Sequence, residues 1–263
     1  MENRDNKENY VSGKTQHEYV ESNGKTVLLD LWGVILDQEK AGEVMVDAYR
    51  KQAAEENVPA ETIDIVVSDY QKVLQNDKSV SDRKGEIVNT LQDLAEKYIE
   101  NSDDDEIANN LEESVYEDSI RVISRARSEG YNVAIFTTRA AEWVREFIED
   151  ELGEIYEAPE GKTAERFNEI CRYEISNGRR VVSFTEDAAK ALKAAQEAGY
   201  VINSIIYINR GDNGLSREEC EENGIVYTEN LEDVYDHIVN EVEDDGLGEL
   251  VNFEEDGLSE AGE

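Results

Sequence analysis

Short apolar runs and longer amphipathic segments alternate along most of this sequence. The runs over 26–30, 131–136, 180–184, 204–208 and 225–227 are rich in β-branched residues and leucine, which predicts buried strands. Apolar residues spaced three and four apart predict helices over 117–129, 162–175, 186–197 and 230–242. Regular alternation of strand and helix is typical of an α/β fold with a parallel sheet and helices on both of its faces.

One long block departs from this alternation. Residues 39–57, 60–76 and 85–100 have the helical pattern, and no strand pattern interrupts them before an acidic turn, Ser102 to Asp105, which we expect to close the block. The sequence therefore predicts a core domain made of 25–37 and 116–240, with an all-helical cap, 38–115, inserted into it.

The two ends of the chain have a different composition from the rest. Residues 1–24 form a polar leader that we expect to be disordered, and it finishes at the turn-prone pair Asn23-Gly24. Residues 241–263 form an acidic tail with ten Asp and Glu residues, for which solubility is a sufficient role.

Charge excludes several classes of partner. The chain has 63 acidic and 26 basic residues and a net charge of -37, so it should be repelled by nucleic acids and by anionic membranes. An acidic surface throughout the chain is typical of the acidic proteome of a halophile, where salt screens self-repulsion. The sequence has no apolar stretch of membrane-spanning length and no apolar signal-peptide core, which indicates a cytoplasmic protein. It does not indicate an oligomeric state, and Cys171 and Cys220 are expected to be ordinary thiols.

Polar residues follow the predicted strands at the places where a parallel sheet binds ligands. Asp30, Thr137 with Thr138, and the pair Glu186-Asp187 come after strands, and Lys162 is expected to begin a helix. The carboxyl ends of parallel strands meet at one edge of the sheet, so these side chains should converge. A carboxylate nucleophile, a hydroxyl, an ammonium and acidic ligands for Mg²⁺ are the groups that phosphoryl transfer requires.

Purely structural roles are also open for some of these residues. Thr137 and Thr138 could cap a helix predicted over 140–149, and Glu186 and Asp187 could be an acidic first turn, where carboxylates are electrostatically favoured. Arginines after two strand ends, Arg139 and Arg210, could bind phosphate, but exposed arginines are common and we leave them out of the predicted site.

Several short motifs together resemble a known family. The segment Leu28-Leu-Asp-Leu-Trp-Gly-Val-Ile35 resembles the first motif of the haloacid dehalogenase (HAD) superfamily. In order and spacing, further segments resemble the enolase-phosphatases (acireductone synthases) of methionine salvage over residues 26 to 235: Val115–Asp118, Phe136–Thr138, Gly161–Thr163, Phe184–Asp187 and Asn209–Ser216.

The resemblance implies a Rossmann-like HAD core with a helical cap and a phosphohydrolase activity. It implies that Asp30 becomes a phospho-aspartate and that the Trp32 carbonyl, Glu186 and Asp187 join it in binding Mg²⁺. The hydroxyls of Thr137 and Thr138 would hold phosphoryl oxygens. Lys162 would neutralise the negative charge of the nucleophile and of the phosphate. The implied substrate is a small phosphorylated metabolite, in this family a phosphorylated diketone with a methylthio group.

Two positions depart from the family pattern. Trp32 occupies the place of the carboxylate that protonates the leaving oxygen and later activates water, and an indole cannot do either. At the metal position Glu186 replaces the usual Asp. Hydrolysis of a phosphate ester is the first hypothesis. A binding or regulatory protein that has lost catalysis is the second, and a dehalogenase-like hydrolase, which also needs no acid at position 32, is the third.

Overall fold

The computed structural model describes residues 23–75, 77–102, 104–139, 154–200, 202–211 and 214–239. Its strands are β1 (Lys25–Leu29), β2 (Asn132–Thr137), β3 (Ile155–Glu157), β4 (Arg180–Glu186), β5 (Ser204–Ile208) and β6 (Val226–Thr228). They form one sheet in the order β3-β2-β1-β4-β5-β6, and every neighbouring pair is parallel. The predicted α/β fold with a parallel sheet is therefore confirmed, with β1 in the interior of the sheet.

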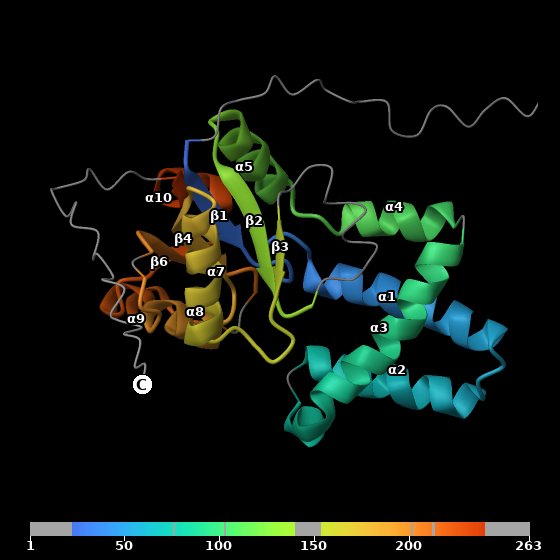
Figure 1. Cartoon of the computed structure of the whole chain (residues 1–263). Coiled ribbons are helices and arrows are strands. Elements are labelled where there is room, and N and C mark those ends of the chain that lie inside the picture. Colours follow the sequence, from blue (N-terminus) through green and yellow to red (C-terminus); the bar gives the residue numbers. More distant parts are fainter. Residues whose placement is uncertain are drawn as a thin grey trace, which may run out of the picture.

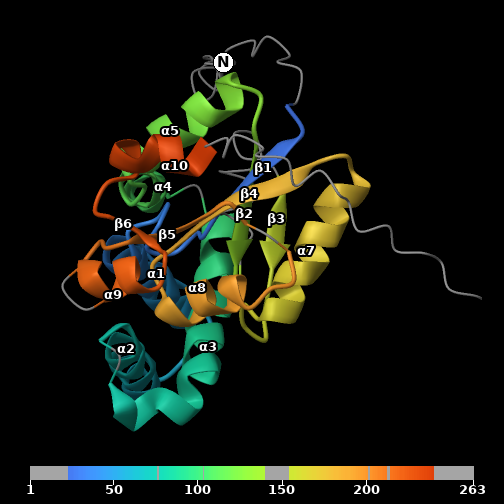
Figure 2. The same cartoon turned by 90° about the vertical axis from the view of Figure 1, so that its left-hand side faces the viewer.

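Successive residues of the inner strands are buried on opposite faces. Val27 and Leu29 of β1 join one apolar cluster with α5 (Glu117–Ser128) and α10 (Tyr235–Val239), whereas Leu28 joins another with α7 (Ala164–Ser176) and α8 (Ala189–Gln196). Figure 2 shows α5 and α10 on one side of the sheet and α7 and α8 on the other. Burial of both faces explains why these strands are rich in apolar residues and do not strictly alternate between apolar and polar residues.

Most of the remaining helices come between β1 and α5 in the sequence. They are α1 (Gln38–Glu55), α2 (Ala60–Leu74), the 3-10 helix η1 (Lys78–Arg83), α3 (Lys84–Asn101) and α4 (Asp105–Glu113); after β5 come α9 (Arg217–Glu222) and the 3-10 helix η2 (Leu231–Val234). The expected helical block is present, but the acidic turn does not close it, because the Asp104 side chain caps a further helix, α4.

Helices α1 to α4 pack mainly on one another and gather at one side of the core (Figure 1). The chain enters and leaves this helical block along two adjacent connections. Leu36 and Val115 form an antiparallel bridge, Asp37 N donates to the Ser114 carbonyl at 2.7 Å, and Tyr116 N donates to the Ile35 carbonyl at 2.9 Å. This paired connection is the geometry that an insertion between two core elements requires. That the helical block acts as a cap stays a prediction.

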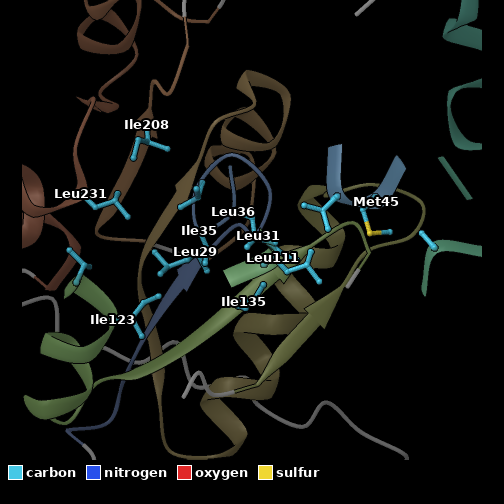
Figure 3. Close-up of a cluster of buried hydrophobic side chains, with 14 of the residues drawn as sticks. Leu29, Leu31, Ile35, Leu36, Met45, Leu111, Ile123, Ile135, Ile208 and Leu231 are labelled. Carbon is cyan, nitrogen blue, oxygen red and sulfur yellow. The ribbon is translucent and has the colours of Figure 1, made fainter. Parts of the chain in front are cut away.

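An apolar cluster continues from the core into the helical block through the loop after β1. Leu31, Ile35 and Leu36 of this loop are fully buried and belong to the same cluster as Met45 of α1 and Leu111 of α4 (Figure 3). The loop that follows Asp30 is thus held by packing from both sides.

Three predicted helix boundaries are wrong, and two of them concern residues of the predicted site. The helix expected over 162–175 begins at Ala164 with Thr163 as its cap, so Lys162 precedes the helix. The helix expected over 186–197 begins at Ala189, because Glu186 is the last residue of β4. The final helix is short and follows η2, and its expected continuation past residue 239 lies outside the described residues, as do the helix 140–149, the acidic tail and most of the leader.

Candidate active site at the carboxyl edge of the sheet

Asp30 lies directly after β1, between the ends of the neighbouring strands β2 and β4. Leu29 pairs with Ile135 of β2 and with Thr185 of β4, and Asp30 N donates to the Thr185 carbonyl at 2.9 Å. The residue is only 6% exposed. Asp30 is therefore held at the edge where ligands bind to parallel sheets of this kind.

Lys162 joins two carboxylates from different segments. Its Nζ lies 2.6 Å from Asp30 Oδ1 and 2.5 Å from Glu186 Oε2, and all three side chains are buried. The expected convergence of Asp30, Lys162 and Glu186 is thus present in the structure. Lys162 itself directly precedes Thr163, the residue that caps the start of α7.

Burial dominates the electrostatics of this group. It raises the pKa of the Asp30 carboxyl well above its ordinary value, with a further contribution from the negative charge of Glu186. It likewise raises the pKa of Glu186 and of Asp187. Burial opposes the charge on Lys162, but Asp30 and Glu186 outweigh it and raise the pKa of the ammonium. Three carboxyl groups thus lie near one ammonium, and added positive charge would favour their ionised forms.

The arrangement of carboxylate oxygens can accommodate a metal ion. Asp30, Glu186 and Asp187 each offer an oxygen within 4.8 Å of the others. Glu186 Oε1 already accepts from the Asp187 and Ala188 backbone amides, both at 3.1 Å, and Oε2 contacts Lys162. Asp187, which is half-buried, is therefore the acid of the pair with more freedom to turn toward an ion.

Gly33 allows Asp187 its position. Its φ is +79°, and a Cβ built on it would lie 2.0 Å from Asp187 Oδ2. Both the left-handed backbone and the contact disfavour a side chain at this position.

Substituting Gly33→Ala should lower the free energy of unfolding by about 1–2 kcal/mol from the left-handed backbone alone, and it should displace Asp187. A matched control is Gly85→Ala on α3, where a Cβ would meet nothing within 4 Å. Thermal unfolding should show a lower melting temperature for the first variant only. Equal melting temperatures in the two variants would contradict this account of Gly33.

The two threonines at the end of β2 have different environments. Thr137 is fully buried, and its hydroxyl donates to the Arg139 carbonyl at 3.3 Å, whereas Thr138 is exposed. Trp32 is half-buried, and its Nε1 also donates to the Arg139 carbonyl at 3.3 Å. The indole is thus fixed beside the end of β2.

The two arginines left out of the predicted site have well-defined partners. Arg210 Nη2 donates to Asp118 Oδ1 at 2.9 Å, and the guanidinium stacks on the Tyr116 ring, so it ties the loop after β5 to α5. Arg139 contacts α3 of the helical block instead. The partners of both are distant in sequence, and no local pattern in the sequence indicates these contacts.

The sequence matches the family model of the haloacid dehalogenase-like hydrolases over residues 25–199. The chain belongs to this HAD-like hydrolase family. The match includes Asp30, Lys162, Glu186 and Asp187, and it extends across the helical block. No curated protein matches the HAD chain at a significant level, so its resemblance to the enolase-phosphatases stays a prediction.

Solved structures share the HAD fold at low sequence identity. A 2-haloacid dehalogenase from Pseudomonas syringae pv. Tomato DC3000 is 18% identical, with a TM-score of 0.50 over 81% of this chain and 97% of that one. YfnB from Bacillus subtilis, assigned as a HAD-hydrolase and bound to magnesium, is also 18% identical, with a TM-score of 0.50 over 84% and 100% of the two chains. A protein assigned as a phosphatase, from Clostridium difficile, is 16% identical, with a TM-score of 0.50 over 83% and 100%. These likenesses support the fold alone.

None of the helices in the described ranges combines the length and the apolar character needed to cross a bilayer.

Proposed function

We propose that this HAD hydrolase is a Mg²⁺-dependent phosphohydrolase that acts on a small phosphorylated metabolite through an aspartyl-phosphate on Asp30. The observation that carries the proposal is the buried contact of Lys162 Nζ with both Asp30 Oδ1 (2.6 Å) and Glu186 Oε2 (2.5 Å) at the carboxyl edge of the sheet. A cation that bridges the nucleophile and a second acid suits a reaction in which negative charge approaches a carboxylate.

In the proposed reaction, an Asp30 oxygen attacks phosphorus and the bond from phosphorus to the leaving oxygen breaks. The leaving oxygen takes up a proton from water, since Trp32 cannot supply one, and a second water later cleaves the phospho-aspartate to phosphate and free Asp30, returning a proton to solvent. Lys162 offsets the negative charge that attack brings to Asp30. The Thr137 hydroxyl is the candidate to hold a phosphoryl oxygen, with Thr138, which is exposed, as the second hydroxyl of the pair.

The residues of the site fit Mg²⁺. Three carboxyl groups with oxygens within 4.8 Å of one another form a hard, all-oxygen donor set, which this ion prefers. Their pKa values are raised by burial, so their ionised forms would gain from added positive charge. Asp30 and Asp187 would be the main side-chain ligands, with Glu186 and the Trp32 carbonyl as the further candidates. When bound, the ion would neutralise the charge of the phosphoryl group.

The helical block would act as a cap. It is joined to the core by the paired connections at Leu36 and Val115, close in sequence to the loop that follows Asp30. A cap at this place would exclude water from the phosphoryl site and contact the leaving group.

A second candidate function is a binding or regulatory module that has lost turnover. Trp32 favours it, because the residue is fixed beside the site and its indole cannot exchange a proton with the leaving oxygen. The dehalogenase-like alternative also uses Asp30 and needs no acid at position 32, but the three clustered carboxyl groups favour a metal-assisted phosphate reaction over it.

A panel of small phosphate esters, including a methylthio-substituted diketone phosphate, tests the proposal. Assays in molar KCl should release phosphate with Mg²⁺ and lose that activity when EDTA removes the ion. Activity that is insensitive to EDTA would contradict the role of the metal. Absence of phosphate release from every ester would favour the binding module, and halide release from 2-haloacids would favour the dehalogenase.

A further inference from the structure

Arg139 connects the end of β2 with the helical block. Its Nη1 donates to Asn89 Oδ1 at 2.9 Å, and its Nη2 donates to Asp93 Oδ1 at 2.8 Å and lies 3.4 Å from Glu96 Oε2. These three partners lie on one side of α3, since they are spaced three and four residues apart. One guanidinium thus holds almost two turns of this helix.

The backbone of the same residue contacts the candidate site. The Arg139 carbonyl accepts hydrogen bonds from Thr137 Oγ1 and from Trp32 Nε1, both at 3.3 Å. Thr137 is the proposed phosphate-binding hydroxyl, and Trp32 lies two residues after Asp30. Arg139 therefore contacts Thr137 and Trp32 with its carbonyl and the helical block with its side chain.

Within the described ranges, the other contacts between the block and the core are of a different kind. The block is joined to the core by the connections at Leu36 and Val115 and by apolar packing on the loop 31–36. Apolar packing is not directional, whereas a guanidinium with several defined acceptors fixes an orientation. Two carboxylates, Asp93 and Glu96, attract the one cation, and Glu96 is largely buried, which limits screening by salt.

We infer that Arg139 is a positioning residue that sets the placement of α3 relative to Thr137 at the end of β2. The inference rests on the proposed phosphohydrolase function, in which the block acts as a cap. Loss of the guanidinium would let α3 move relative to Thr137 and would weaken the binding and alignment of the substrate.

The test compares Arg139→Ala and Arg139→Lys with the control Arg121→Ala. Arg121 is a surface arginine that likewise binds two carboxylates, Glu117 and Glu232, but both of its partners belong to the core. The Ala variant of Arg139 should lose about 10- to 100-fold in kcat/KM, with a higher KM, because small misplacements near a reacting group have effects of this size. Arg139→Lys should recover part of the loss, since lysine keeps the charge but not the planar fork. The control should match the parent.

A second measurement does not depend on turnover. Hydrogen–deuterium exchange of α3 and of residues 134–139 should become faster in Arg139→Ala and remain unchanged in Arg121→Ala. Asp93→Ala should give the same change, and the double variant should show little beyond Arg139→Ala.

Unchanged kcat/KM together with unchanged exchange in Arg139→Ala would overturn the inference while the phosphohydrolase proposal stands. If the parent releases no phosphate from any ester, the proposed function fails, and the exchange measurement alone decides whether Arg139 fixes α3. Faster exchange would then support the placement of α3, and unchanged exchange would overturn it.

Discussion

Replacing Asp30 with Asn should reduce phosphate release by at least about 10³-fold, because removal of a covalent nucleophile in other enzymes costs up to about 10⁶-fold. The variant should still fold. Burial already disfavours the charged form of Asp30, as the direction of its pKa shift indicates, so the neutral amide removes an electrostatic cost. Steady-state kinetics with the best ester of the panel, together with a melting temperature, measure both expectations.

A matched control for this substitution is Asp82→Asn, since Asp82 is an exposed residue of η1. Its activity should equal that of the parent. Full activity in the Asp30 variant would exclude Asp30 as the nucleophile, whereas loss of both activity and melting temperature would show a folding defect instead.

Replacing Trp32 with Asp should increase the turnover of alkyl phosphates by about 10²- to 10⁴-fold, the usual contribution of a positioned general acid or base. The leaving oxygen of an alkyl phosphate needs a proton, and the indole at this position supplies none. Aryl phosphates release a more stable anion and should gain much less. Parallel assays with one alkyl and one aryl ester therefore measure the effect as a ratio.

The control for this prediction is Trp32→Asn. It removes the indole and its hydrogen bond to the Arg139 carbonyl as Trp32→Asp does, but it offers no acid. If the Asn variant gains as much as the Asp variant, the gain comes from space rather than from proton transfer. If neither gains on alkyl esters, position 32 is not where a general acid can act in this chain.

The sequence predicts the sheet well because its inner strands are buried on both faces. β1, β2 and β4 are rich in apolar residues and are buried along nearly their whole length, and a polar residue stands at or directly after the end of each strand. Asp30 and Glu186 could be placed at one edge for that reason. β3 was missed, because its three residues are only half-buried and form no such run.

The sequence predicts the block of helices but not its limits. The segment that forms α4 is polar, and its start depends on the Asp104 side chain, which accepts from two backbone amides. The position of Lys162 before α7 and that of Glu186 within β4 were also not predicted, since boundaries depend on caps and strand register rather than on periodicity. The contacts of Arg139 with α3 join residues about fifty positions apart, which no local pattern indicates.

The central claim is that Asp30 carries the phosphoryl group. Rapid acid quench of the enzyme during turnover, followed by peptide mass spectrometry, tests it most directly. The account predicts a phosphorylated peptide with the modification on Asp30 that is absent from the Asp30→Asn variant and disappears when substrate is exhausted. Turnover without any phosphorylated peptide, or a phosphoryl group on another residue, would contradict it.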